Sequence, residues 1–218
     1  MAEISNSMDK LLQEEKYTSY ILEHQRNVFK AYTILFTKEN IDKLFGNAQI
    51  DYIRNFMDSL LKEISMHDES KFSDEEFDGY RLHFYPTDEE KNTTKSEDDI
   101  RLEQEKFEEA WKHHYMNNDH HPFYWQYHKY ERNEDKITFV ECEKLDIPTD
   151  MTIKAILHMI CDWEAMSIKF NTNTVEWYCT KAEKERSAMS EKTRKKVETI
   201  LGILYNTKIE IATDENNK

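Results

Sequence analysis

Four side chains in three separate segments have the chemistry of metal ligands. They are His24, the doublet His67-Asp68, and Asp162. Imidazole nitrogens and carboxylate oxygens together bind Mn, Fe, Co, Ni or Zn, and such sites leave positions open for water and substrate. A carboxylate is costly to bury unless it is paired, hydrogen-bonded or bound to a metal. The residue types therefore indicate a buried site for a divalent transition metal.

The first two segments read as helices with one buried face. In residues 7–36 the apolar residues recur with a helical period, and His24 stands four residues before Val28 on the apolar face. In residues 51–68 one apolar stripe leads into the doublet. We therefore expect all three of these side chains to point inward.

The third segment reads as a buried helix over residues 149–170. Thr149 or Asp150 is the expected cap, and apolar residues occupy most of the circumference. Asp162 lies in the middle of this helix, one turn after His158. We expect Asp162 to be a ligand, and His158 to support a ligand by hydrogen bonding rather than to bind the metal itself.

The rest of the chain predicts shorter elements around these helices. They are a helix from the capping box Ser73-x-x-Glu76 to His83, an exposed charged insertion at 86–99, a helix at 100–115, a short extended piece at 137–140 and an amphipathic helix at 190–205. Residues 113–128, HHYMNNDHHPFYWQYH, crowd histidines and aromatic rings into an irregular loop. A functional loop and a packed aromatic plug are both open there.

The composition favours an all-α fold. The 218 residues include only 3 Gly and 3 Pro, which all-β folds use in turns. The length suits one domain, so we predict a single helical domain over residues 1–207 with a flexible tail at 208–218. The three cysteines are far apart with no CxxC, which argues against a zinc ribbon or a disulfide framework.

Charge and the amino-terminal sequence limit the partners and the location. The formal net charge of −14 would repel the phosphate backbone of a long nucleic acid. A small phosphorylated substrate stays open, because a bound metal supplies local positive charge. The first residues lack a signal peptide, and no segment suits a membrane span. We therefore expect a cytoplasmic protein with no membrane partner; the oligomeric state is not predicted.

The order of these residues resembles the HD superfamily of metal-dependent phosphohydrolases. That family has a histidine on an opening helix, then a His-Asp doublet, then an aspartate on a later helix. The segment HQRNVFKAYTIL begins with His24, HDESK matches the HDxxK form through Lys71, and HMICDWEAM contains Asp162. The resemblance spans roughly residues 15–170. It implies an HD-type helical bundle with a buried metal site.

The resemblance also implies roles for single residues. His24, His67, Asp68 and Asp162 would bind one metal, and Asp68 would be able to bridge to a second. Lys71 would hold a phosphate, so Asp68 and Lys71 are the candidate catalytic residues.

The histidine-rich loop is similar to the additional His motifs of two-metal HD proteins, with His114 and His121 as the preferred ligands. In those relatives the extra histidines commonly lie further apart, which leaves contact with substrate as the alternative. The string HHYMNNDHHPFYW also resembles an uncharacterised family of small bacterial and phage proteins. The substrate is therefore left open.

Ordinary structural roles compete with each assignment. A single inward histidine such as His24 is usually a hydrogen-bonded core residue. The doublet could be a solvated helix end, where a histidine meets the dipole. Asp162 could form a buried ion pair with Lys or Arg. The ordered set of all four favours a metal site over these separate explanations.

The function we expect is hydrolysis of a nucleotide or another small phosphorylated metabolite, by attack of metal-bound water on phosphorus. Two alternatives remain. Similar His/Asp shells with two irons activate oxygen, and a non-enzymatic metal-binding or ligand-binding protein, such as a phage accessory protein, would use the same residue types.

Overall fold

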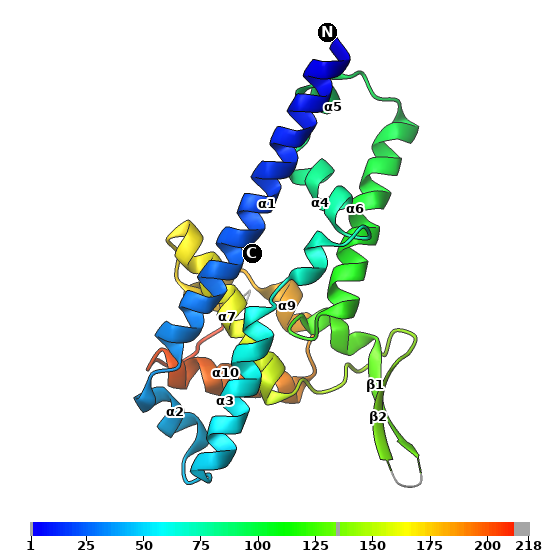
Figure 1. Ribbon diagram of the computed structural model, residues 1–218. Helices are drawn as coiled ribbons and strands as arrows, with labels where there is room; N and C mark the ends of the chain where they lie inside the picture. Colours follow the sequence, from blue (N-terminus) through cyan, green and yellow to red (C-terminus); the bar gives the residue numbers. More distant parts are fainter. Residues whose placement is uncertain (1, 134–135, 212–218) are drawn as a thin grey trace, which may run out of the picture. The chain divides into compact units, whose positions relative to one another are not determined.

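The computed structural model describes residues 2–133 and 136–211, which are mostly helical (Figure 1). The α-helices are α1 (Ala2–Leu35), α2 (Lys38–Phe45), α3 (Ile50–Ser65), α4 (Phe77–Phe84), α5 (Asp88–Asn92), α6 (Glu97–Asn117), α7 (Ile153–Phe170), α8 (Thr174–Thr180), α9 (Glu183–Ser187) and α10 (Glu191–Leu204). Two 3-10 helices, η1 (Glu69–Phe72) and η2 (Pro122–Gln126), and two strands, β1 (His128–Asn133) and β2 (Lys136–Glu141), complete the described elements. The prediction of a predominantly helical fold is confirmed.

The described residues form two compact units. Unit 1 consists of the chain up to Gln25 together with Asp68–Asn118, and unit 2 of Arg26–His67 together with the chain from Asp119 onward. One of the boundaries falls inside the doublet, between His67 and Asp68. Each unit therefore uses two separate stretches of the predicted domain over residues 1–207, and no single cut in the chain separates them.

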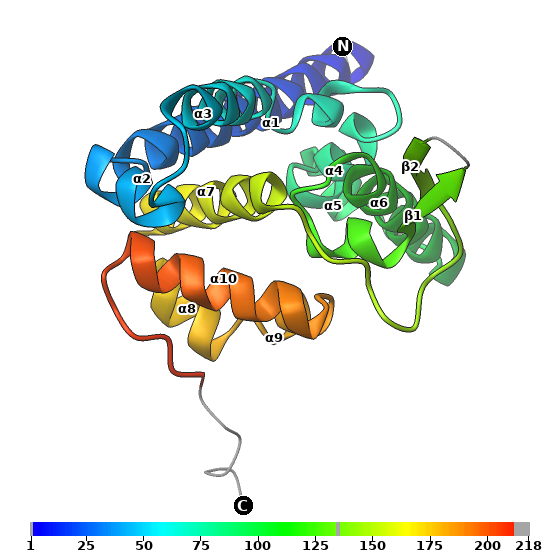
Figure 2. The same cartoon turned by 90° about the horizontal axis from the view of Figure 1, so that it is seen from below.

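Unit 1 is held together by close packing of α4 on α6, which lie side by side in Figure 2. Its small core contains Tyr17, Tyr80 and Ala110, all buried. The two helices approach closely at Gly79, where an added Cβ would lie only 2.7 Å from the Cβ of Ala110 and 2.7 Å from the carbonyl oxygen of Lys106. Real Cβ atoms do not come this near, so the packing requires glycine at this position.

Unit 2 is organised around α7. This helix is buried over most of its length, as its apolar sequence predicted, and it packs against α3 and α8. The carboxyl-terminal end of α10 lies next to α2 (Figure 2), where Asn40 Nδ2 donates to the carbonyl oxygen of Leu204 at 3.2 Å. The core of unit 2 includes Leu60, Leu157 and Trp125.

The long predicted helices form, with corrections at their ends. Helix α10 matches the predicted range closely, with Ser190 as its cap, whereas α1 ends near the predicted residue but begins five residues earlier, at Ala2. Helix α7 starts later than expected, because Thr152 rather than Thr149 or Asp150 is its N-cap and accepts from the amide of Ala155 at 3.1 Å. The second predicted helix was expected to reach Asp68, but α3 ends at Ser65.

Two local predictions were wrong. The capping box Ser73-x-x-Glu76 does not start a helix at Ser73, because α4 begins at Phe77 with Glu76 as its N-cap. The segment 86–99 is exposed at most positions, but it is not an irregular loop. It contains α5, which begins with a capping box between Thr87 and Glu90.

A small antiparallel hairpin interrupts the helical fold in unit 2. The extended piece expected at 137–140 lies in β2, and it pairs with β1, which the sequence did not predict. The register runs from His128 opposite Glu141 to Asn133 opposite Lys136.

Two further expectations concern membranes and the tail. Among the residues that the structure describes, no helix combines the length and apolar character that a membrane span requires. Of the tail predicted at 208–218, residues 212–218 lie outside the described residues.

Candidate metal centre

A tight turn after α3 positions the His-Asp doublet. Met66 follows the last residue of α3, and Asp68 adopts a left-handed backbone conformation with φ 57° and ψ 23°. This conformation is uncommon outside glycine, although Asp tolerates it better than most residues. The 3-10 helix η1 then begins at Glu69. Both His67 and Asp68 are buried, with 1% and 2% of their surface exposed.

In unit 1, two histidines lie close to the carboxylate of Asp68. Nε2 of His24 is 3.7 Å from Oδ2, and Nε2 of His114 is 3.4 Å from Oδ1. The first separation is too long for a hydrogen bond and the second is at the upper limit. Two ligand atoms bound tetrahedrally at about 2.0–2.1 Å from one metal lie about 3.4 Å apart. The spacing therefore fits shared metal coordination on each side of the carboxylate.

Lys71 supplies a positive charge to the same carboxylate. Its Nζ lies 2.5 Å from Oδ2 of Asp68, which is the residue three positions earlier, and 5.6 Å from the ring centroid of Tyr80. The lysine side chain is largely covered, at 17% exposure, so the ammonium is held close to Asp68 rather than extended into solvent. An ammonium group beside a carboxylate that could hold a metal is well placed to bind an anion.

Glu76 lies behind His114 and was not identified as a site residue from the sequence. Its carboxylate is fully buried and accepts from Nδ1 of His113 at 2.8 Å and from Nδ1 of His114 at 2.9 Å. Burial alone would raise the pKa of Glu76, but the bonds from His114, His113 and Ser70 hold this pKa below its ordinary value. Two ring nitrogens at hydrogen-bond distance from one buried carboxylate favour the charged form of Glu76, which accepts from both.

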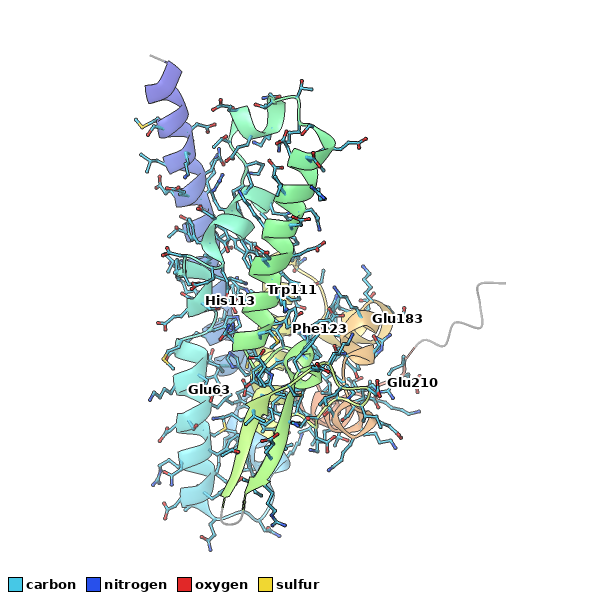
Figure 3. All side chains as sticks on the ribbon, turned by 90° about the vertical axis from the view of Figure 1, so that its right-hand side faces the viewer. Glu63, Trp111, His113, Phe123, Glu183 and Glu210 are labelled. Atoms are coloured by element: carbon cyan, nitrogen blue, oxygen red, sulfur yellow. The ribbon has the colours of Figure 1, made fainter. Side chains whose placement is uncertain are left out.

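Both partners of Glu76 come from the end of α6. His113 lies on this helix together with Trp111, and both are labelled in Figure 3. Burial lowers the pKa of His114, whereas the charge of Asp68 and the bonds to Asp68 and Glu76 raise it, and the net shift is upward. The spacing Ser73-x-x-Glu76 gave no signal of this contact, because its partners lie 37 and 38 residues further along the chain.

In unit 2, His67 has a different carboxylate partner. Its Nε2 lies 3.7 Å from Oδ1 of Asp162, again longer than a hydrogen bond. On the other side of the ring, Nδ1 of His67 lies 2.9 Å from Nε2 of His158. The side chain of Asp162 is 17% exposed, so it is less deeply buried than the sequence predicted.

His120 completes a group of three buried histidines in unit 2. Its ring centroid lies 4.7 Å from that of His67 and 4.4 Å from that of His158. One nitrogen of each of the three lies within 4.8 Å of the others, so the group could hold a metal ion. The ring of His121 is 4.3 Å from that of His120 and is half-buried.

The structure thus places the predicted site residues in two sets. Unit 1 brings together His24, Asp68, Lys71 and His114, and unit 2 brings together His67 and Asp162, with His121 beside His120. His128, in contrast, stacks on Tyr124 with a centroid distance of 3.7 Å, and its Nδ1 donates to the carbonyl oxygen of Tyr124 at 2.8 Å, so its role is packing.

His67 and His114 are oriented in the same way. His67 and His114 each use Nδ1 to contact a buried side chain, His158 and Glu76 respectively, and each presents Nε2 to an aspartate. Metal-binding histidines in proteins are usually oriented by such a bond at the other ring nitrogen. The donor types, their burial and their orientation therefore fit a divalent transition metal.

Comparison with known proteins identifies a family but no characterised relative. A protein-family model described as a family of unknown function (DUF5662) matches residues 13–203. No curated protein and no solved structure shows significant similarity to the chain.

Proposed function

The chain belongs to this family of unknown function, and we propose that it is a metal-dependent phosphohydrolase acting on a nucleotide or another small phosphorylated metabolite. We assign His24, His67, Asp68 and Asp162 as the metal ligands. A second ion would use Asp68 with His114 and His121. The HD-type bundle is part of the same proposal, and it rests on the order of these residues in the chain.

The observation that carries the proposal is the environment of Asp68 within unit 1. One buried carboxylate has an imidazole nitrogen near each of its two oxygens and an ammonium group at 2.5 Å from one of them. Two imidazoles and a carboxylate suit a transition metal. The ammonium favours phosphoryl transfer over oxygen activation, because a phosphate needs positive charge beside the metal and dioxygen does not.

Asp68 and Lys71 have different roles in the proposed reaction. A divalent metal, when bound, supplies a water of lowered pKa and polarises a phosphoryl oxygen. Asp68 would hold the ion, and its interaction with Lys71 would then be weakened. The ammonium of Lys71 is released to bind a phosphoryl oxygen, which holds the phosphate in position and stabilises its developing charge.

Charge and composition support a small substrate. The net charge of −14 disfavours a long nucleic acid, whereas a single phosphate group is met locally by Lys71 and the metal. A cytoplasmic location belongs to the proposal, and the free thiols of Cys142, Cys161 and Cys179 are consistent with it.

Turnover of metal-loaded protein tests the proposal. The purified chain, supplied with Mn²⁺, Co²⁺, Fe²⁺ or Zn²⁺, should hydrolyse at least one member of a panel of nucleoside mono- and triphosphates, cyclic nucleotides and an aryl phosphate. Lys71→Ala should keep its metal but lose activity, whereas Asp68→Ala should lose both. Lys91→Ala is the matched control, because Lys91 also pairs with an aspartate three residues earlier in unit 1, but at 49% exposure.

The alternatives predict other results. An absence of turnover across the panel, or full activity of Lys71→Ala, would contradict the phosphohydrolase. Two bound irons with oxygen consumption would indicate the oxygen-activating alternative. A metal site without any exchangeable water would indicate a structural or ligand-binding role.

A further inference from the structure

We infer that Glu76 is a positioning residue that fixes the tautomer and the direction of His114, so that His114 presents Nε2 to Asp68. The inference rests on the proposed function in one respect, since it treats His114 as a metal ligand. It assigns a role in the site to a residue whose sequence context indicated only a helix cap.

The two ring nitrogens of His114 face opposite carboxylates within unit 1. Nδ1 lies 2.9 Å from Oε2 of Glu76, and Nε2 lies 3.4 Å from Oδ1 of Asp68. A carboxylate in its charged form only accepts hydrogen bonds, so the short contact requires a proton on Nδ1 of His114. In the neutral ring this leaves the lone pair on Nε2, which is the atom that a metal needs.

The other polar groups near Nδ1 are already engaged in ways that suit this tautomer. Nδ2 of Asn118 is 3.3 Å from Nδ1, but it donates to Oγ of Ser70 at 3.0 Å and to the carbonyl oxygen of His114 at 2.8 Å. Oγ of Ser70 is also 3.3 Å from Nδ1. Both contacts are longer than the bond to Glu76, which is therefore the main acceptor for the Nδ1 proton.

Glu76 also fixes the end of α6 by binding two consecutive residues. Its Oε1 accepts from Nδ1 of His113 at 2.8 Å while Oε2 binds His114. Hydrogen bonds to a charged carboxylate are stronger than bonds between neutral groups. The side chains of His113 and His114 project from α6 in different directions, because they are consecutive residues of a helix. The two bonds to Glu76 therefore restrict rotation of the end of α6 and rotation of the ring of His114.

The position of Glu76 at the start of α4 leaves its carboxylate available to the histidines of α6. Glu76 is the N-cap of α4, and within the described part of the chain its side chain makes no cap bond to that helix. The contact of Gly79 with Ala110 and Lys106 then brings the start of α4 close to α6. The carboxylate is thereby directed toward the two histidines instead of its own helix.

The experiment compares Glu76→Gln with the wild type and with Glu90→Gln. Glu90 is the matched control, because it is another glutamate of unit 1 that pairs with a basic side chain; it accepts from Arg81 at 2.7 and 2.9 Å and is 28% exposed, whereas Glu76 is fully buried. Long-range ¹H–¹⁵N NMR of the metal-free proteins, recorded at a pH high enough for the ring of His114 to be neutral, reports its tautomer, because the neighbouring carboxylates raise the pKa of this histidine. Titration with Co²⁺ or Zn²⁺ gives the metal Kd.

We expect an Nδ1-protonated His114 in the wild type and in Glu90→Gln. In Glu76→Gln the amide can donate to Nδ1, so a substantial population should carry the proton on Nε2, and the metal should bind about 10–100-fold more weakly. Glu76→Asp keeps the charge on a shorter side chain and should retain the Nδ1 proton, with an intermediate affinity. A loss of stability alone would not change the tautomer.

The inference is overturned if His114 of the wild type carries its proton on Nε2. This measurement uses the wild type alone, so it does not depend on whether a variant folds. The inference is equally overturned if Glu76→Gln leaves the tautomer or the metal affinity unchanged. If the wild type binds no metal while the tautomer depends on Glu76, the proposed function fails and the orientation of His114 by Glu76 stands.

Discussion

Replacing Gly79 by alanine is expected to separate α4 from α6 and to weaken metal binding through Glu76. The new Cβ would lie 2.7 Å from the Cβ of Ala110 and from the carbonyl oxygen of Lys106, whereas ordinary contact begins near 3.4 Å. Backbone atoms of Lys106 cannot rotate away as a flexible side chain can. Helix α4 must therefore move by about 0.7 Å.

The size of the effect follows from two opposing contributions. Overpacking by one methyl group costs about 1–3 kcal/mol, and alanine in a helix regains about 0.5–1 kcal/mol relative to glycine. The expected net loss is about 1–2 kcal/mol, or roughly 2–8 °C in Tm for a chain of this size. If Glu76 moves away from α6 by the same distance of about 0.7 Å, its 2.9 Å hydrogen bond to His114 lengthens to about 3.6 Å, which is beyond hydrogen-bond range.

Gly202→Ala provides the control for helix propensity. Gly202 lies in α10, and its added Cβ would meet only the carbonyl oxygen of Thr207, at 3.1 Å. We expect this variant to differ from the wild type by less than about 0.5 kcal/mol, because the gain in helix propensity offsets the small shift that the 3.1 Å contact requires. Urea unfolding followed by circular dichroism and a Co²⁺ titration measure both effects. If Gly79→Ala is as stable as Gly202→Ala and binds Co²⁺ like the wild type, the described packing of α4 on α6 is wrong.

Three further predictions concern pH, metal removal and proteolysis. The hydrogen bonds from Arg81 lower the pKa of Glu90 to about 2 from an ordinary 4.5. This pair therefore stabilises the fold fully above pH 4.5 and loses its effect as the pH falls toward 2. In Glu90→Gln the free energy of unfolding should depend less on pH over that range. Chelation of metal-loaded protein should lower Tm by roughly 5–10 °C, because free metal at a hundredfold over Kd stabilises the folded state by about 2.7 kcal/mol. An unchanged Tm would argue against a metal site in the folded state. Limited proteolysis should cut first at residues 93–96 between α5 and α6, which are exposed except for the half-buried Lys95. Mass spectrometry showing first cleavage within α7 would contradict the burial of that helix.

Apolar periodicity was sufficient to predict the long helices. In α7 the buried residues cover most of the circumference, and in α10 they follow one stripe, so each helix is defined by its own sequence. The short helices α2, α8 and α9 were missed because each has eight residues or fewer, which is too short for a periodic pattern to develop. Strand β1 was missed because HKYERN has no alternation of apolar and polar residues.

The types of the candidate site residues were predictable from the sequence, but their pairing was not. The apolar stripe of α3 leads toward His67 and Asp68, yet the left-handed backbone of Asp68 ends the regular path, and sequence periodicity carries no signal for such a turn. Glu76 finds its partners through the packing of α4 on α6, which depends on contacts between distant segments. The local capping pattern predicted a bond from Glu76 to its own helix, whereas the side chain binds His113 and His114 instead.

The most direct test of the account is the metal content of the wild-type protein, purified without chelator or affinity nickel after growth with Mn, Fe, Co and Zn supplied. Inductively coupled plasma mass spectrometry should find at least one of these ions per chain, and His24→Ala, His67→Ala and Asp162→Ala should each lower the content sharply, while Glu90→Gln should not. Wild-type protein that contains none of these metals, and that takes up none on titration, would contradict the central claim.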